Sequence, residues 1–434
     1  MRKTSYLDGF QGSLWNTTAA AAPATEQLQD SVNCDVVIIG AGFTGLNAAL
    51  KLASKGVDVK VLEAGELGIG SSGRSGGQVN LGLNLGPNEL IAKFGHDQGE
   101  RVINTVLKAP EYVFNLIREH NINCDAVQKG WVQAALNSNY LKLQQQLVLD
   151  YARFGLTLDL LDKQALNVKT GTSTYVGGLY CPIAGSIQPL SYTRELARVS
   201  ISKGAKVYTR SSVRQLVKAS KGWRVDTENG QINCSAVLVC TNAYTGDLLP
   251  RLSKTLVPVR SILIATEPLS PKLRESILPG QVTFVDKRRL ILYCRYDTNG
   301  RLCVGDHGPS RDTFTLSDFV HVKKRAAKVF PLLSDVRWDF HWGGRVAMTK
   351  DSLPFMHELA PGLIAGMGYN GRGVAMGSMM GALLADYLLS NAQAESAFPI
   401  TRPDKFKMHA FRDIGVATAI KWFTLRDYLE GLIG

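Results

Sequence analysis

The alternation of apolar and polar residues predicts a strand–helix–strand unit close to the start of the chain. The run Val36-Val37-Ile38-Ile39 is short, β-branched and uninterrupted, which is typical of a strand buried on both faces. Residues 46–54 are rich in Ala and Leu and predict a helix, which Gly56 ends as a C-cap would. Residues 57–62 alternate as a second strand. This order of elements predicts an α/β fold with a parallel sheet.

The rest of the chain divides by the same patterns. Helical spacing is found at residues 88–120, 140–154, 191–203, 373–389 and 411–432. Strand-like runs are found at residues 131–135, 206–209, 213–217, 222–227, 231–234, 236–240, 259–266, 290–296, 302–305 and 363–366. Residues 213–234 predict a small antiparallel meander, and residues 257–305 predict a second, mixed sheet. The polar residues 1–33 predict an extended arm on the surface.

Composition limits the class of protein. Hydrophobic residues make up 45% of the 434 positions and charged residues 20%, which are ordinary globular values and exclude a disordered chain. The seven cysteines are odd in number and form no C-x-x-C pair, so we expect neither a disulfide framework nor a metal site. With no signal-peptide pattern and no apolar run of about 18 residues, we expect a cytoplasmic protein without stable membrane insertion.

The net charge of +12 fits nucleic acid, an anionic membrane surface or an acidic substrate as a partner. Lys and Arg are nevertheless spread along the chain. The densest groups, residues 286–289 and 323–325, are most simply part of a solvated face. Basic and aromatic residues do not interleave in them, so we expect no nucleic acid partner.

A glycine motif, Gly40-x-Gly42-x-x-Gly45, stands between the first strand and the first helix. Its glycines permit a tight turn, a close approach of the backbone to a pyrophosphate and close helix–strand packing. Glu63 follows Gly45 by 18 positions, at the end of the second strand, where a carboxylate accepts hydrogen bonds from ribose hydroxyls. The sequence therefore predicts a dinucleotide site, with an ordinary glycine turn as the alternative.

A second glycine-rich segment, residues 68–78, follows soon after. A nicotinamide site does not need a second cradle so close to the ribose acid, whereas a flavin ring has to lie against bare backbone beyond the pyrophosphate. Arg74 and Gln78 are unusual in a mere flexible loop, which is the alternative. We therefore predict FAD.

A third group of glycines lies near the C-terminus, at residues 341–354 and 366–374. The second stretch is typical of a strand end, a glycine turn and a helix start. The positive end of that helix would stabilise the reduced flavin at its N1–C2=O edge. An NAD(P) loop at Gly371-x-Gly373-x-x-x-Gly377 is the alternative, but no strand ending in an acid follows it.

With these motifs the chain resembles the D-amino-acid oxidase-like superfamily of flavoproteins, and within it the γ-glutamylputrescine oxidase branch. The resemblance is carried by the Gly40–Gly45 loop with Leu62-Glu63-Ala64, Ser72–Gln78, Trp342-x-Gly344 with Thr349-x-Asp351-x-x-Pro354, and Gly368–Val374. It implies an α/β protein, α+β overall, with a Rossmann-like FAD-binding domain of the glutathione-reductase type and an inserted mixed β-sheet substrate domain. The implied bounds are 34–85, 181–250 and 336–392 for the FAD-binding domain, 86–180 and 251–335 for the substrate domain, 1–33 for the arm and 393–434 for a C-terminal helical segment.

The resemblance also implies the site residues. FAD would be held by Gly40, Ala41, Gly42, Phe43, Thr44, Gly45, Glu63, Ala64, Ser71, Ser72, Gly73, Arg74, Gly76, Gly77, Gln78, Val213, Asn242, Gly344, Gly371, Arg372, Gly373 and Val374. We expect non-covalent FAD, because Gly344 stands about where some relatives carry a linking cysteine and residues 68–80 contain no His. The substrate-pocket candidates are Tyr293, Arg295, His341, Tyr369 and Asn370, with Arg295 as a carboxylate anchor or a surface arginine and His341 as a pocket residue or a structural histidine.

The family chemistry implies oxidation of a C–N bond in a small amine or amino-acid derivative, as in polyamine catabolism. A hydride passes to flavin N5, the imine hydrolyses, and O2 reoxidises the flavin to give H2O2. The alternatives are an amino-acid dehydrogenase that passes electrons to a quinone or carrier, and a non-metabolic FAD protein acting on tRNA. The lysine that sarcosine oxidases place beside N5 has no counterpart in residues 302–305. The sequence therefore does not decide between O2 and another electron acceptor. The amphipathic helix predicted at residues 411–432 is compatible with an electron acceptor at the membrane or with ordinary packing against the protein.

Overall fold

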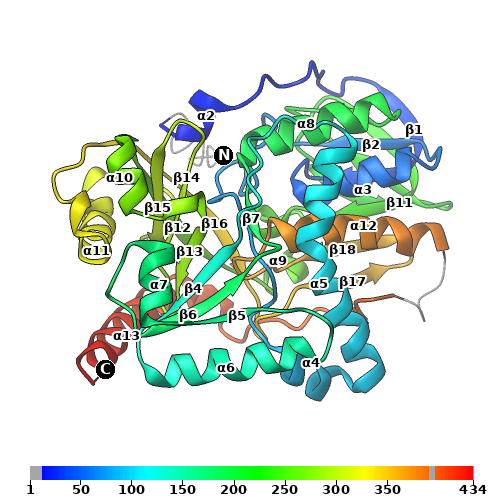
Figure 1. The fold of residues 1–434 in the computed structure, drawn as a ribbon. Helices are drawn as coiled ribbons and strands as arrows, with labels where there is room; N and C mark the ends of the chain where they lie inside the picture. Colours follow the sequence, from blue (N-terminus) through cyan, green and yellow to red (C-terminus); the bar gives the residue numbers. More distant parts are fainter. Residues whose placement is uncertain (1–11, 391–395, 434) are drawn as a thin grey trace.

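Two large sheets dominate the computed structural model, which describes residues 12–390 and 396–433 (Figure 1). The first sheet has the strand order β19-β17-β18-β11-β1-β2-β8, and the hairpin β9–β10 pairs with β11. Its strands are β1 (Ser31–Ile39), β2 (Val59–Leu62), β8 (Lys206–Tyr208), β9 (Gln215–Lys218), β10 (Trp223–Asp226), β11 (Gln231–Val239), β17 (Phe355–Ala360), β18 (Leu363–Met367) and β19 (Ile400–Thr401). The neighbours from β18 to β8 pair in parallel, so the predicted α/β fold is confirmed.

The two faces of the first sheet are covered differently. Successive side chains of a strand point to opposite faces, and Ile38 shares its core with helices while Val37 shares its core with the hairpin. The helices are α3 (Phe43–Ala53), α5 (His96–Glu119), α8 (Pro189–Ser202) and α12 (Ala375–Ser390). Both faces of the central strands are therefore apolar, which explains the uninterrupted β-branched run of β1.

The second sheet has the strand order β16-β12-β15-β14-β13-β4-β6-β5. Its strands are β4 (Trp131–Ala135), β5 (Asp159–Asp162), β6 (Gly177–Cys181), β12 (Val257–Pro268), β13 (Thr283–Asp286), β14 (Tyr293–Tyr296), β15 (Arg301–His307) and β16 (Trp338–Met348). Helices α7 (Lys163–Thr170) and α11 (Val320–Val329) pack their apolar residues into a core with this sheet. The predicted mixed sheet is thus present, and it extends beyond residues 257–305.

Two segments depart from the expected domain bounds. Strand β16 pairs with β12 in the second sheet, although residues 336–392 were expected with the first. Helix α5 belongs to the core of the first sheet through Val102 and Val106, although residues 86–180 were expected with the second. Apolar spacing identifies a helix or strand but not the sheet that it joins. With these changes, the division into a cofactor-binding and a substrate-binding region stays a proposal.

Residues 19–30 are the largely exposed, extended arm that their polar composition predicts, but residues 13–18 are not. Helix α2 (Leu14–Thr18) buries Leu14 and Trp15 completely, and the Oγ of Ser13 caps it by accepting a hydrogen bond from the N–H of Trp15. Leu28 is buried beside the β9–β10 hairpin. Isolated apolar residues in a polar segment carry no periodic signal, so the sequence pattern missed them. Residues 1–11 of the expected arm lie outside the described residues.

Other boundaries differ locally. Gly95, with a φ of 80°, splits the helix predicted over residues 88–120 into α4 (Pro87–Phe94) and α5. The runs 231–234 and 236–240 form the single strand β11, and residues 287–292 form a loop before β14. Helices α6 (Ser138–Ala152) and α13 (Arg412–Ile433) confirm the prediction, while the short elements β3 (Gln78–Val79), β7 (Gly185–Ser186), α9 (Pro250–Ser253) and α10 (Pro271–Ser276) were not predicted. Among residues 12–390 and 396–433, no helix is both long and apolar enough to span a membrane.

Candidate functional site

A cavity of about 910 Å³ is lined by residues from both sheets. The first sheet contributes the carboxyl ends of β1, β2 and β11, where open α/β sheets bind their ligands. The second sheet contributes residues of β12, β14, β15 and β16. Most site residues expected from the sequence line this cavity, and the exceptions are Gly45, Gly73, Arg295 and His341.

The first glycine loop has the shape that a pyrophosphate requires. Gly40 has a φ of +102°, and a Cβ on Gly45 would lie 2.0 Å from the carbonyl oxygen of Gly40. Helix α3 starts at Phe43, and its N-cap, Gly42, offers no side chain to the first amides. The N–H of Phe43 donates to Oγ of Ser72 at 3.0 Å, which ties the loop to the second glycine segment. A helix N-terminus on a cavity wall suits a phosphate.

Glu63 follows β2, and backbone groups hold its carboxylate. Oε2 accepts from the N–H of Ala41 at 2.9 Å, and Oε1 accepts from the N–H of Gly65 at 3.1 Å. Burial raises the pKa of Glu63, and hydrogen bonds from backbone N–H groups oppose that rise. A fixed acceptor on the cavity wall fits the ribose role that the spacing predicts.

The second glycine segment folds so tightly that side chains are excluded. A Cβ on Gly73 would lie 2.1 Å from the carbonyl oxygen of Gly68, and one on Gly77 would lie 2.2 Å from that of Ile187. Arg74 is buried, and its Nε donates to the carbonyl oxygen of Ile69 at 2.8 Å. Burial lowers the pKa of Arg74. The segment therefore presents mainly backbone to the cavity, as a planar ring requires.

Two buried indoles hold this segment in place. Nε1 of Trp15 donates to the carbonyl oxygen of Ser75 at 2.9 Å, and Nε1 of Trp342 donates to that of Arg74 at 3.0 Å. The two rings pack edge to face with centroids 5.5 Å apart. Helix α2 and strand β16, which are far apart in the sequence, thus fix consecutive residues of one loop.

Arg295 lies behind the cavity wall. Its Nε donates to the carbonyl oxygen of Gly76 at 2.8 Å, and its Nη2 donates to that of Ile187 at 2.7 Å. Its guanidinium also lies 4.5 Å from the ring of Trp15. Arg295 therefore positions the second glycine segment; it is 3% exposed, so it is neither the surface arginine nor, in this structure, the carboxylate anchor that the sequence left as alternatives.

The turn between β18 and α12 is fixed by amide side chains. Oδ1 of Asn370 accepts from the N–H of Thr349 at 2.8 Å, and its Nδ2 donates to the carbonyl oxygen of Gly368 at 2.6 Å. Oδ1 of Asn242 accepts from the N–H of Gly368 at 3.0 Å. Gly371 follows with a φ of 88°. The side-chain amide of Asn370, a substrate-pocket candidate, is thus already engaged in hydrogen bonds that fix the turn.

The ring of Tyr293, a substrate-pocket candidate, packs closely into the cavity wall. A Cβ on Gly76 would lie 2.7 Å from this ring, and one on Gly305 would lie 2.0 Å from it, so both glycines make room for the tyrosine. Its hydroxyl is hydrogen-bonded to Oγ of Ser261 at 2.9 Å. Burial raises the pKa of Tyr293, which keeps the phenol neutral.

Tyr369 and His341 are placed less favourably for a substrate. The hydroxyl of Tyr369 donates to the carbonyl oxygen of Gly366 at 3.1 Å and shares a hydrogen bond with Thr44 at 2.6 Å. His341 packs edge to face on Phe319 with centroids 5.1 Å apart, outside the cavity lining. Within the described residues its buried Nε2 has no hydrogen-bond partner. Burial lowers the pKa of His341.

The basic run at residues 286–289 is only partly a solvated face, which corrects the sequence interpretation: Asp286 is buried and Lys287 and Arg288 are half-buried, while Arg289 is exposed. The loop before β14 lines the cavity through residues 287–291, which include Lys287, Arg288 and Arg289. The run of charges alone could not distinguish a surface from a cavity wall. An informative signal was that its cations, residues 287–289, directly follow Thr283–Asp286, a buried strand.

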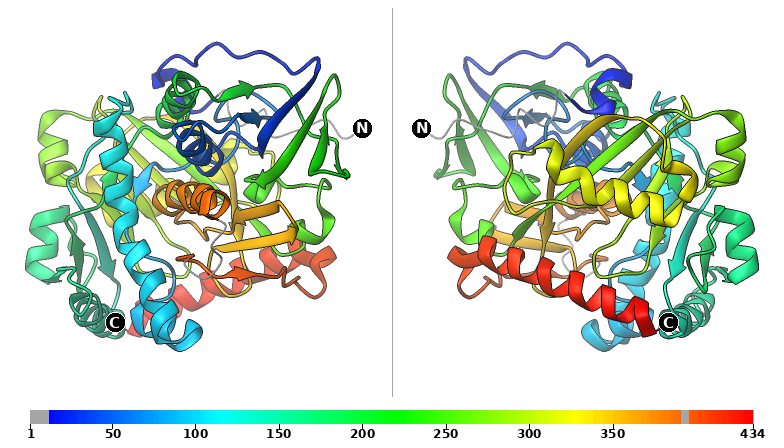
Figure 2. Two further views of the ribbon diagram at one scale, coloured as in Figure 1. Left: turned by 90° about the vertical axis from the view of Figure 1, so that its right-hand side faces the viewer. Right: turned by 90° about the vertical axis from the view of Figure 1, so that its left-hand side faces the viewer.

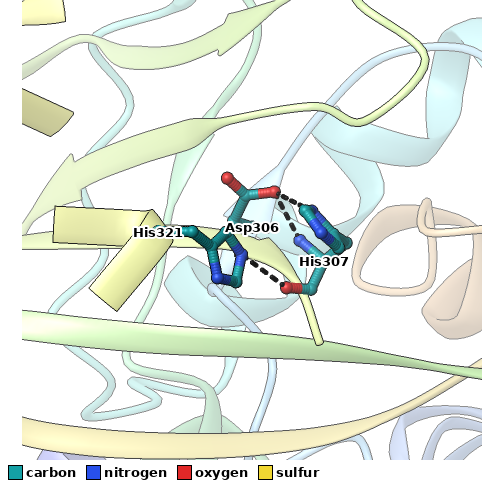
Figure 3. A group of neighbouring side chains, drawn as sticks. All are labelled: Asp306, His307 and His321. Atoms are coloured by element: carbon teal, nitrogen blue, oxygen red, sulfur yellow. Dashed lines mark hydrogen bonds and ion pairs between the residues drawn. The ribbon is translucent and has the colours of Figure 1, made fainter. Parts of the chain in front are cut away.

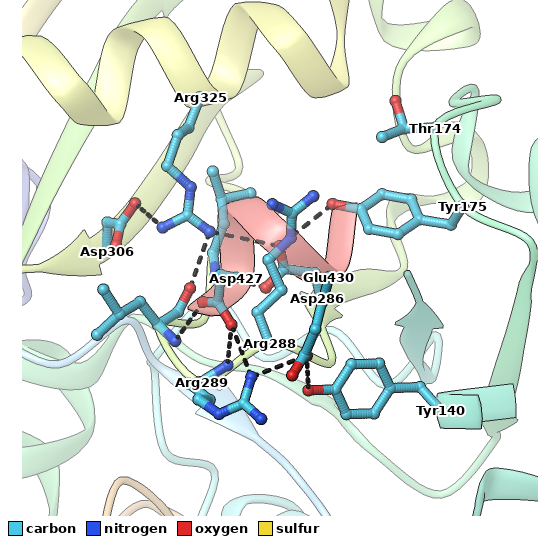
Figure 4. Close-up of polar contacts among 12 residues, drawn as sticks. Tyr140, Thr174, Tyr175, Asp286, Arg288, Arg289, Asp306, Arg325, Asp427 and Glu430 are labelled. Carbon is cyan, nitrogen blue, oxygen red and sulfur yellow. Dashed lines mark hydrogen bonds and ion pairs between the residues drawn. The ribbon is translucent and has the colours of Figure 1, made fainter. Parts of the chain in front are cut away.

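Asp286 balances part of this charge (Figure 4). Its Oδ2 lies 3.0 Å from Nε of Arg288 and 3.4 Å from Nη2 of Arg325, which belongs to α11. Burial raises the pKa of Asp286 to about 6, although both guanidinium groups oppose the rise. Arg325, the last residue of the second basic run, is thus half-buried and paired with a buried carboxylate.

Arg289 connects the loop to helix α13 (Figure 4). Its Nη1 lies 2.8 Å from Oε2 of Glu430 and 3.4 Å from Oδ1 of Asp427. Tyr140 donates to the same oxygen of Glu430 at 3.1 Å. The helix held in this way lines the cavity through Val416, Ala419, Ile420 and Phe423, which the sequence did not identify as site residues.

Asp306, His307 and His321 form a compact cluster in which possible metal-ligand atoms lie within 4.8 Å of one another (Figure 3). Oδ1 of Asp306 is 2.6 Å from Nδ1 of His307, and Oδ2 is paired with Arg325. The ring of His321 lies 4.5 Å from that of His307. Both carboxylate oxygens of Asp306 are thus engaged with protein groups, so the cluster does not indicate a metal site.

Three glycine segments around one cavity, at the carboxyl ends of a Rossmann-like sheet, define a flavin-dependent oxidoreductase. The chain belongs to the DAO family of FAD-dependent oxidoreductases, whose model matches residues 35–387. FAD is therefore its cofactor, and the resemblance and the cofactor predicted from the sequence are confirmed.

Curated relatives match over most of their length. The chain is 32% identical to the probable oxidoreductase OrdL of Haemophilus influenzae, over 91% of this chain and 92% of the relative. It is also 32% identical to the gamma-glutamylputrescine oxidoreductase of Escherichia coli, over 86% of this chain and 88% of the relative. Among solved structures, glycine oxidase from Geobacillus kaustophilus aligns with a TM-score of 0.72 at 22% identity, over 85% of this chain and 99% of that chain. This likeness confirms the predicted fold.

Proposed function

We propose that the protein oxidises a C–N bond in a small amine that also carries a carboxylate, a γ-glutamylputrescine-like compound, with O2 as the electron acceptor. The relative named gamma-glutamylputrescine oxidoreductase supports this substrate class. When bound, FAD supplies the chemistry by accepting a hydride equivalent from the carbon next to the nitrogen. The imine that remains on the substrate is hydrolysed by water.

The observation that carries the proposal is a pair of cations on the cavity wall. Lys287 and Arg372 both line the cavity, and within residues 12–390 and 396–433 neither forms an ion pair. Arg372 lies 5.0 Å from the ring of Trp131 and donates to the carbonyl oxygen of Leu81 at 3.3 Å. Half-buried cations without a counter-charge favour an anionic ligand group. A substrate carboxylate would supply that charge.

The electrostatics around Lys287 support the same conclusion. Burial lowers the pKa of Lys287, and the nearby charge of Arg372 lowers it further. Glu89 opposes these effects, but its carboxylate accepts a hydrogen bond from the N–H of Gly86 at 2.8 Å. An incoming carboxylate between the two cations would relieve their mutual repulsion.

The apolar part of the cavity lining suits a neutral amine. Tyr293, Leu263 and Val346 line it, and a largely apolar wall disfavours the ammonium form through desolvation. Only the deprotonated amine can give up a hydride readily. The chain's contribution is therefore to orient the amine, to exclude water and to favour its neutral form, and no side chain needs to act as a nucleophile.

We also propose that FAD is bound without a covalent link. A Cβ on Gly344 would lie 3.3 Å from Cβ of Arg74, so this position is packed against the second glycine segment and offers no thiol. Residues 68–80 contain no His. Denaturation in acid followed by centrifugation should leave all yellow colour in the supernatant; colour in the pellet would contradict the proposal.

Anaerobic reduction of the bound flavin tests the substrate class. We expect γ-glutamylputrescine to bleach the flavin and putrescine, which lacks the carboxylate, to do so far more slowly. Lys287→Met should lower kcat/KM for γ-glutamylputrescine by roughly ten- to a hundredfold, because a charge-assisted hydrogen bond is lost, and leave putrescine unaffected. Lys324→Met, the same change at an exposed position, is the control. Bleaching by D-amino acids with no response to γ-glutamyl polyamines would contradict the substrate.

The acceptor is tested separately. We expect stoichiometric H2O2 during aerobic turnover. A reduced flavin that persists in air and is reoxidised by a soluble quinone would instead favour the dehydrogenase, which has the same cofactor site but a different electron acceptor.

A further inference from the structure

Helix α13 carries two apolar stripes on different faces. One, formed by Val416, Ala419, Ile420 and Phe423, lines the cavity. The other, here called the outer stripe, consists of Met408, just before the helix, and Phe411, Ile414, Trp422, Leu425 and Leu429. Its members are between 44% and 78% exposed, with Met408 the most exposed. Figure 2 shows α13 along the outer edge of the molecule.

Ion pairs fix which face of this segment points outward. Asp427 and Glu430 pair with Arg289, Asp413 lies 3.5 Å from Arg260, and Asp404 lies 2.9 Å from Lys350. The acids between residues 400 and 433 are therefore all paired with cations from other parts of the chain. They hold the helix against the cavity with the outer stripe toward solvent.

The cations of the same segment are distributed differently. Arg402, Lys405, Lys407 and Lys421 are exposed, and no ion pair involves them within the described ranges. The four acids are thus neutralised by cations from the rest of the chain, whereas Arg402, Lys405, Lys407 and Lys421 remain unpaired beside the outer stripe in the part of the chain that the structure describes. A row of exposed apolar residues flanked by unpaired cations has the chemistry that an interfacial helix presents to anionic lipid.

We propose that the outer stripe and its flanking lysines dock the protein on the surface of an anionic lipid bilayer, with α13 parallel to the membrane plane. Trp422, Leu425 and Ile414 would enter the interface, and Lys405, Lys407 and Lys421 would lie among the headgroups. The inner face of the same helix lines the cavity, so docking would bring the cavity wall next to the membrane. The inference concerns this surface alone and does not depend on the proposed substrate.

Other occupants fit the charges less well. A second copy placed on the same face would bring two rows of unpaired lysines together, which is unfavourable. Nucleic acid would pair with the lysines but would leave the apolar side chains exposed. An anionic membrane satisfies both kinds of residue.

Vesicle sedimentation of the FAD-loaded protein tests the proposal. We expect binding to phosphatidylcholine vesicles containing phosphatidylglycerol, weakening as salt rises, and little binding to phosphatidylcholine alone. The triple change Lys405→Glu, Lys407→Glu, Lys421→Glu should lower the partition coefficient by roughly a hundredfold. The change Ile414→Gln, Trp422→Gln, Leu425→Gln should abolish binding, because the apolar anchor is lost.

Matched variants separate docking from a general effect of exposed apolar residues. Val168 and Leu316 are 72% and 71% exposed and lie outside α13, so Val168→Gln and Leu316→Gln should leave binding unchanged. Flavin absorbance shows that each variant is folded. Absence of binding to anionic vesicles would overturn the proposal, as would light scattering that shows a dimer which the α13 variants dissociate.

Discussion

Gly45 shows at the scale of one residue how an absent side chain shapes the first glycine loop. We predict that Gly45→Ala yields protein with little bound FAD, because the new Cβ would lie 2.0 Å from the carbonyl oxygen of Gly40 and would open the loop. FAD affinity, measured by flavin fluorescence on reconstitution, should fall at least roughly a hundredfold, as expected for about 3 kcal/mol of strain or lost contacts.

Gly415→Ala is the matched control, because a Cβ there meets no atom within 4 Å. It lies in a helix, so alanine should leave stability unchanged or raise it by about 0.5–1 kcal/mol. A normal FAD content in Gly45→Ala would show that the loop adjusts and that the glycine is dispensable.

Residue spacing predicted which residues of the cavity wall lie together around one local turn. Gly40, Gly42 and Glu63 follow from a local motif, since the turn, the helix start and the strand end are adjacent in the sequence. Arg295 and Lys287 could not be assigned in this way. Their roles depend on which loop packs behind a strand, and one residue type serves equally on a surface, in a wall or behind it.

At the scale of secondary-structure elements, ion pairs hold helix α13 against the rest of the protein. Hydrogen bonding from Arg289 lowers the pKa of Glu430 to about 2, below its ordinary 4.5. A folded pKa below the unfolded one means that the ionised carboxylate stabilises the attached helix above about pH 4.5. This contribution is lost as the pH falls from 4.5 through 2.

We predict that Arg289→Ala loosens α13 at neutral pH, because Asp427, which is buried, and Glu430 would both lose their ion pair with the guanidinium. Asp427 would keep its hydrogen bonds from the backbone N–H groups of residues 289 and 290. Hydrogen-exchange protection of the helix should fall by roughly ten- to a hundredfold. In the parent protein the same loosening should appear only toward about pH 3. Arg210→Ala, which removes an exposed pair with Glu66, should leave the protection of α13 as it is. Equal protection in both variants would contradict the role of Arg289.

Periodicity predicted most long elements but not their partners. The strand at residues 131–135 and the helices after Asn137 and Gln188 have strong local signals, and the structure has them. Strand β16 and helix α5 join sheets that the expected boundaries did not assign to them, because pairing depends on contacts distant in sequence. Helix α2 has too few residues for any period to appear.

At the scale of the whole molecule, one cavity joins segments from most of the chain. We predict that FAD stabilises the protein as a unit: at a free concentration about 100 times its Kd, it should add about 2.7 kcal/mol and raise Tm by roughly 3 °C. Differential scanning calorimetry of apo and reconstituted protein measures this. An unchanged Tm would mean that the three glycine segments do not share one ligand.

The edge-to-face indoles that hold the second glycine segment have an optical consequence. Trp15 and Trp342 donate hydrogen bonds to consecutive residues of the loop that borders the cavity. Indole emission overlaps the near-ultraviolet absorption of an isoalloxazine, so excitation energy absorbed by this pair passes to a nearby ring instead of being emitted. Cofactor loading can thus be followed by the dimming of the protein's own light, without a label.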